Sequence, residues 1–141
     1  MSDKVDYYRQ CLRSLSSNIL EFSLIVDQLN AIETKLEHIK GGIVKRPDGK
    51  ADDCLFHDLV EQKDEWEAMM NAKITMINEA NNIIYFAKGQ AHKVLAMRYR
   101  KGQPVAKICV ALELKRSEYY NIIDNVLCMY RIAKEKENGK K

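Results

Sequence analysis

Five side chains that can contact DNA lie within seven positions of the C-terminal third: Lys115, Arg116, Ser117, Tyr120 and Asn121. Arg and Lys bond to guanine edges or to phosphates, Asn pairs with adenine, and Ser and Tyr hydroxyls bond to phosphate oxygens. We expect a helix that begins at about Arg116 to present these side chains. The pattern predicts a DNA-reading surface at the start of that helix.

The surrounding residues, 104–131, have the pattern of a helix-turn-helix motif. Such a motif needs a small residue where its helices cross, a hydrophobic residue just after the turn, and another about four to five positions later. Cys109, Leu114 and Tyr119 occupy these positions in that order. We predict the first helix over 105–112 and the second from about 116. This geometry leaves the start of the second helix projecting outward, where it can enter a major groove.

Basic residues also flank the motif. A short helix predicted over 91–100 leaves basic side chains outside, and we expect four residues to contact the flanking phosphates: Arg98, Arg100, Lys101 and Lys107. Residues 88–141 have 13 Lys+Arg against 5 Asp+Glu, a net charge of +8, whereas residues 1–87 have a net charge of −5. This asymmetry favours a polyanionic partner, most commonly nucleic acid.

Part of this region matches a known pattern. The matching residues are Val94 to Tyr99, Gly102, Ile108, Leu112, and Arg116 to Tyr120. They resemble the fourth region of bacterial sigma factors and, more closely, the small phage regulators related to it, of the ArpU and RinA kind. Those proteins commonly join a long helical N-terminal part to a sigma-like helix-turn-helix. The resemblance implies a cytoplasmic regulator of phage or prophage genes that binds promoter DNA and can contact host RNA polymerase.

Two positions depart from that family's pattern. Lys115 stands where the family favours Ser or Thr as the cap of the recognition helix, so Ser117 could cap instead and shift the helix start. Glu113 stands where the turn often has Gly or a small polar residue, which bears on its left-handed backbone conformation. Both departures affect which side chains reach the bases.

The N-terminal part predicts two long helices. Residues 4–40 contain no Pro or Gly, and apolar residues recur in steps of 3 and 4 at Val5, Tyr8, Leu12, Leu15, Ile19, Phe22, Val26 and Leu29. A repeated step of 3 near Leu29 predicts a stammer there. Gly41-Gly42 and the turn at 46–49 stop this helix, and Asp52 or Asp53 can cap a second one that reaches about Ala87. Trp66 and the methionines fit its core.

We therefore predict an all-α protein with three parts: an antiparallel coiled-coil hairpin over 1–88, a three-helix DNA-binding head over 89–133, and a disordered basic tail over 134–141. A single head contacts few bases, so we expect a homodimer or recruitment through polymerase. Two alternatives stay open: a small terminase-like subunit that recognises packaging sites, and a coiled-coil adaptor whose head does not bind DNA.

The sequence of 141 residues gives little indication of enzymatic activity, metal binding or membrane contact. The sequence has no Gly-rich phosphate loop, nucleophile elbow or zinc-protease motif, and its three histidines are scattered, so we predict no enzymatic activity and no cofactor. Cys54 and His57 have zinc-ligand spacing but no second pair. No transmembrane run or signal peptide occurs, so we expect a cytoplasmic protein without membrane contact.

Overall fold

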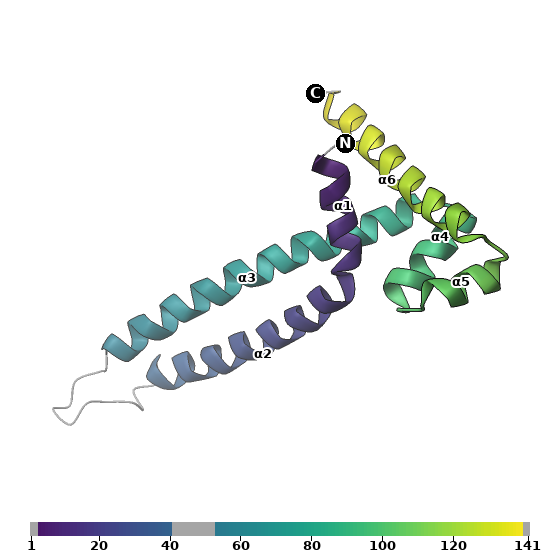
Figure 1. The fold of residues 1–141 in the computed structure, drawn as a ribbon. Coiled ribbons are helices and arrows are strands. Elements are labelled where there is room, and N and C mark those ends of the chain that lie inside the picture. The colour runs from purple at the N-terminus through teal and green to yellow at the C-terminus, as the bar shows by residue number, and fades with distance from the viewer. Residues whose placement is uncertain (1–2, 41–52, 140–141) are drawn as a thin grey trace. The chain divides into compact units, whose positions relative to one another are not determined.

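The computed structural model describes residues 3–40 and 53–139, and every regular element in these ranges is helical (Figure 1). The elements are α1 (Asp3–Arg13), α2 (Leu15–Lys40), α3 (Asp53–Phe86), α4 (Gln90–Leu95), the π-helix η1 (Ala96–Arg100), α5 (Val105–Leu112) and α6 (Arg116–Gly139). The predicted all-α class is confirmed. The predicted stop at Gly41-Gly42, the turn at 46–49 and the cap at Asp52 lie outside the described residues.

The chain divides into two compact units. The head unit comprises residues 1–18 and 76–141, and the hairpin unit comprises residues 19–75. This division differs from the predicted boundary at residue 88, because α1 and the end of α3 contribute buried residues to the core of the head unit. The head unit has 16 Lys+Arg against 8 Asp+Glu, a net charge of +8, and the hairpin unit has a net charge of −5.

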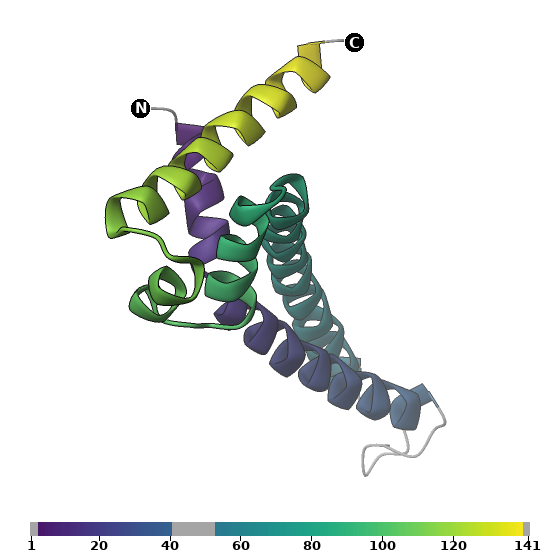
Figure 2. The ribbon, with the colours of Figure 1, turned by 90° about the vertical axis from the view of Figure 1, so that its right-hand side faces the viewer.

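In the hairpin unit, α2 and α3 lie side by side and run antiparallel (Figures 1 and 2). Glu33 of α2 pairs with Lys63 of α3 at 3.9 Å, and Glu21 pairs with Lys73, so positions that rise along one helix fall along the other. An apolar cluster joins the two helices: Ile32, Leu36 and Leu59, with Ile39, Phe56, Val60 and Trp66 packed against them. Trp66 thus belongs to the core, as its helical spacing predicts.

The predicted single helix over 4–40 is wrong at Ser14, which separates α1 from α2. Its hydroxyl donates a hydrogen bond to the Gln10 carbonyl at 2.7 Å, a local contact that bends helices. The buried positions change there: Asn18 is buried and Ile19 is 50% exposed. The repeated step of 3 therefore falls at Leu12, Leu15 and Asn18, not near Leu29.

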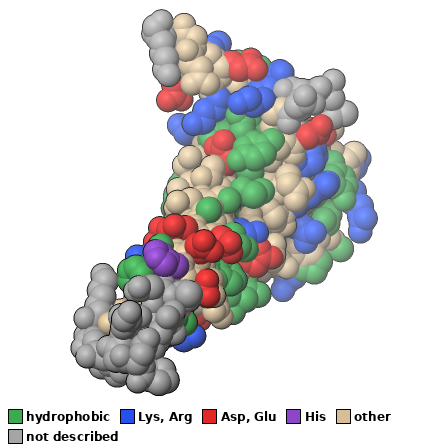
Figure 3. Space-filling model, turned by 90° about the vertical axis from the view of Figure 1, so that its left-hand side faces the viewer, with side chains coloured by type: hydrophobic (Ala, Val, Ile, Leu, Met, Phe, Trp, Pro, Cys, Tyr) green, Lys and Arg blue, Asp and Glu red, His purple; other side chains and the backbone are tan. Residues whose placement is uncertain are grey.

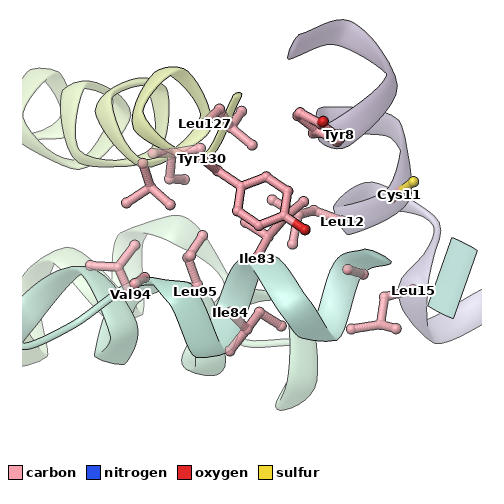
Figure 4. Packing of buried hydrophobic residues seen from close by; sticks show 14 of the residues in the cluster. Tyr8, Cys11, Leu12, Leu15, Ile83, Ile84, Val94, Leu95, Leu127 and Tyr130 are labelled. Carbon is pink, nitrogen blue, oxygen red and sulfur yellow. The ribbon is translucent and has the colours of Figure 1, made fainter. Parts of the chain in front are cut away.

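The core of the head unit contains buried residues from α1, the start of α2, the end of α3, α4, α5 and α6. Tyr130 of α6 points toward Leu12 of α1 and Ile83 of α3 (Figure 4). Its ring lies 5.0 Å from that of Tyr8, and its hydroxyl donates to a Glu79 carboxylate oxygen at 2.6 Å. Burial and this bond raise the pKa of Tyr130. The phenol therefore fixes α6 against α1 and α3 together.

The C-terminal end of the described chain is helical, which differs from the predicted disordered tail. Residues 134–139, predicted as disordered, continue α6 through Gly139. Between Tyr130 and Gly139 the chain has no helix breaker, and most of its residues are Arg, Ala, Lys and Glu, which favour helix. The Lys134 ammonium also lies 5.6 Å from the centre of the Tyr130 ring. Among the described helices, none is long and apolar enough to cross a membrane.

Candidate nucleic-acid interface

The turn between α5 and α6 has the left-handed conformation that the motif requires. Glu113 adopts φ 55° and ψ 48°. The Leu114 N–H donates to the Cys109 carbonyl at 2.9 Å, and the Glu113 N–H donates to the Val110 carbonyl at 3.4 Å. These two bonds form a Schellman motif, which ends α5 and redirects the chain. The turn therefore forms although Glu stands where Gly is usual.

Helix α6 begins at Arg116, and Ser117 does not cap it. The Lys115 N–H donates to Glu118 Oε1 at 3.0 Å, and the Lys115 carbonyl accepts the Tyr119 N–H at 3.0 Å. Glu118 thus makes the reciprocal half of a capping box, which satisfies one donor at the helix start. The helix start predicted at about Arg116 agrees with the structure, and the shift that a Ser117 cap would cause does not occur.

The residues that hold the two helices together are buried as predicted. Ile108, Cys109 and Tyr119 have at most 9% of their surface exposed, and Leu114 packs against the same cluster. Further along α6, the inward positions are Ile123, Val126, Leu127 and Tyr130, with Ile122 partly buried. One face of α6 is therefore committed to the core.

The opposite face carries the five predicted contact residues. Lys115, Arg116, Ser117, Tyr120 and Asn121 are all exposed, with Tyr120 at 50%. The structure brings them together at the start of α6, because Arg116 and Tyr120 lie four residues apart on one side of the helix, as do Ser117 and Asn121. This is an exposed basic and polar surface at a helix N-terminus, where the peptide dipoles also favour an anion.

The four flanking basic residues, Arg98, Arg100, Lys101 and Lys107, have different environments. Arg98 is half-buried and donates to the Gln103 carbonyl at 3.0 Å. Arg100 instead faces α3: its guanidinium carbon lies 4.8 Å from the centre of the Tyr85 ring, and it bonds to Asn81. Lys101 and Lys107 are exposed. Arg100 is thus held by α3 rather than gathered with the contact residues of α6.

The predicted helix over 91–100 changes type half-way. After Leu95 the chain forms the π-helix η1, in which the Lys101 N–H donates to the Ala96 carbonyl at 3.1 Å, five residues back. Short π-helical turns often occur at functional sites. Here the turn contains Arg98 and Tyr99, which both line a cavity. Hydrophobic spacing alone does not reveal such a turn.

That cavity, which we call the arginine cavity, has a volume of about 450 Å³ and lies within the head unit. Its lining residues come from α1, α2, η1, α5 and α6: Arg9, Leu12, Arg13, Ser16, Arg98, Tyr99, Val105, Tyr119, Tyr120 and Ile123. Arg9 also bonds to Asp124 at 3.1 Å. Sequence reasoning missed Arg9 and Arg13, whose spacing of four places them on one side of α1 without showing what they face.

Burial in this region raises the pKa of two tyrosine phenols. Burial raises the pKa of Tyr119 to about 12, and it also raises the pKa of Tyr99. The nearby charges of Arg98, Arg13 and Arg9 act on Tyr99 in the opposite direction. Both phenols are therefore neutral hydrogen-bonding groups at physiological pH.

Charge distinguishes the two units on the surface. Figure 3 shows Asp and Glu side chains clustered on the hairpin unit, whereas Lys and Arg side chains are prominent on the head unit. The candidate interface therefore belongs to the unit with the positive net charge.

No match was found. Neither models of known families, nor curated proteins, nor solved structures correspond to this chain. The resemblance to sigma-like phage regulators thus rests on the residues that carry it.

Proposed function

We propose that this protein is a DNA-binding transcriptional regulator of phage or prophage genes that acts without catalysis. The observation that carries the proposal is the exposure of Lys115, Arg116, Ser117, Tyr120 and Asn121 at the start of a helix whose other face is buried. The Schellman turn before it and the +8 charge of the head unit support the same conclusion.

Binding would proceed in two steps. The basic residues of the head unit attract duplex DNA and contact phosphates, which fixes register without reading sequence. The first two turns of α6 then enter the major groove. There Arg116 can bond to a guanine edge, Asn121 to an adenine, and Ser117 or Tyr120 to a phosphate.

Salt dependence tests the phosphate contacts. We expect the affinity for a fluorescently labelled random duplex, measured by anisotropy, to fall with salt. About five phosphate contacts give a slope of log affinity against log salt of about −4 to −5. Lys101→Ala should weaken all duplexes alike and reduce the slope by about 1. An affinity that does not change with salt, or no binding at low salt, would favour an adaptor with a non-binding head.

Sequence reading is tested at Arg116. A preferred site is first selected from random duplexes. Arg116→Ala should then lose about 1–3 kcal/mol of discrimination between that site and a single-base variant, whereas Lys101→Ala should keep it. If Arg116→Ala folds correctly and keeps its site preference, Arg116 does not read a base.

The hairpin unit is proposed to pair two copies of the chain. Ile19, Leu20 and Leu24 of α2 are 50%, 64% and 57% exposed, an apolar patch of the kind that marks protein contacts. We expect sedimentation equilibrium to give a dimer, and Leu20→Ser with Leu24→Ser to give a folded monomer. A ring of many subunits would favour the terminase-like alternative.

A further inference from the structure

The arginine cavity has the chemistry of an anion site. Three guanidinium groups line it, from Arg9, Arg13 and Arg98, and no carboxylate is among its lining residues. Arg9 donates a hydrogen bond to Asp124 and Arg98 donates one to the Gln103 carbonyl, which leaves further N–H donors on each guanidinium. Within the described ranges Arg13 makes no ion pair. The cavity therefore concentrates positive charge that the protein itself only partly neutralises.

Hydroxyl groups add neutral donors to the same walls. Tyr99, Tyr119, Tyr120 and Ser16 all contribute to the lining. Tyr99 lines the cavity together with Arg98, Arg13 and Arg9, and their charges oppose the rise in its pKa that burial causes. A tetrahedral phosphate suits this arrangement better than a planar carboxylate, because its terminal oxygens can accept bonds from several guanidinium and hydroxyl donors at once.

The cavity is larger and more apolar than a bare phosphate requires. Leu12, Val105 and Ile123 complete the lining beside the three tyrosine rings, and cavities of about 300–1,000 Å³ typically hold small organic ligands. We propose that the arginine cavity binds a phosphate ester that carries an aromatic or apolar group. The phosphate lies among the three arginines, and the attached group lies against the aliphatic side chains and tyrosine rings.

Two sources could supply this ester: a free small organic phosphate, or a phosphate of DNA. Tyr120 contributes to both the cavity and the exposed start of α6. A ligand in the cavity would therefore touch the helix that we propose reads DNA. The connection between the cavity and DNA reading rests on the proposed function. The proposal that the cavity binds a phosphate ester does not.

Phenyl phosphate is the probe for the cavity, because it combines the two chemical features in the smallest form. Titration is followed by methyl NMR, with Leu12, Val105 and Ile123 as cavity reporters and Leu59 of the hairpin unit as a remote reporter. We expect saturable shifts at the cavity reporters only, with phenyl phosphate binding more tightly than either inorganic phosphate or phenol.

Matched variants test the role of charge. Arg13→Gln should weaken phenyl phosphate binding about tenfold or more, since it removes a charged hydrogen-bond donor. Lys93→Gln removes the same charge from an exposed position on α4, outside the cavity, and should change the affinity less than twofold. Equal losses in the two variants would mean general charge attraction. That result, absence of saturation at millimolar concentrations, or shifts outside the cavity would overturn the proposal.

A second measurement separates the two sources. If DNA supplies the phosphate, phenyl phosphate competes with duplex, and Arg13→Gln weakens duplex binding more than Lys93→Gln does. If a free organic phosphate is the ligand, both variants bind duplex alike and the probe does not displace it. Failure of duplex binding altogether would contradict the proposed function but leave the NMR result on the cavity standing.

Discussion

Glu113 provides a direct test of the turn that precedes α6. A non-glycine residue in the left-handed region costs roughly 1–2 kcal/mol, and Glu113 lies there with φ 55°. Its side chain is exposed and makes no hydrogen bond or ion pair within the described part of the chain. Glycine removes the steric cost but loses about 0.5–1 kcal/mol more in chain entropy. Glu113→Gly should therefore raise the free energy of unfolding by about 0.5–1 kcal/mol.

Urea unfolding followed by circular dichroism measures this difference, and a thermal scan should show a rise of about 2 °C in the unfolding midpoint. Glu113→Gln is the matched control, because it removes the charge but keeps the side chain; its stability should stay within about 0.5 kcal/mol of the original. Glu113→Gly should also keep its affinity for duplex DNA. If the glycine variant is less stable than the original, or if the glutamine variant gains as much, the left-handed turn is not the structure in solution.

Two further predictions concern the backbone and the buried phenols of the head unit. Gly89 has φ 64° and ψ −133°, a region almost confined to glycine, and a Cβ there would meet no atom within 4 Å. Gly89→Ala should therefore lose about 1–3 kcal/mol in urea unfolding through backbone strain alone, and an unchanged midpoint would contradict this conformation. Because the pKa of Tyr119 is raised from 10.0 to about 12, its phenol loses its proton first in the unfolded chain. Its contribution to stability is complete below pH 10 and is lost as the pH rises toward 12, by at most about 1.4 kcal/mol per pH unit. Tyr119→Phe should lack this part of the alkaline decline, and identical pH profiles for the two proteins would refute the assignment.

The sequence was most informative where burial repeats with the helical period. Cys109, Leu114 and Tyr119 could be assigned to the inside of the motif because each position follows from local spacing, and the structure buries or packs all three. The exposed residues on α6 followed from the same pattern by exclusion. The charged composition of residues 134–139 predicts disorder, but the helix propensity of the same residues favours the helix that the structure shows.

The sequence pattern did not predict the break at Ser14 or the π-helical turn at Arg98. In each case, a hydrogen bond within one or two turns changes the direction of the following side chains, while the apolar residues keep nearly the same spacing. After Leu15, the next buried residue of α2 is therefore Asn18, a polar residue that a search for hydrophobic spacing does not select.

The amino-acid sequence by itself determined the all-α class, the inward faces of α5 and α6 and the separation of positive from negative charge, because these properties depend on composition and on neighbours within a few turns. Only the tertiary structure decided that α1 joins the head unit and that Arg9 and Arg13 face Arg98 across a cavity. Those residues are about ninety positions apart. These residues come close together only because the buried faces of α1, α3 and α6 pack against one another. Hydrophobic periodicity shows which face of a helix is buried, but it does not show which other helix covers that face.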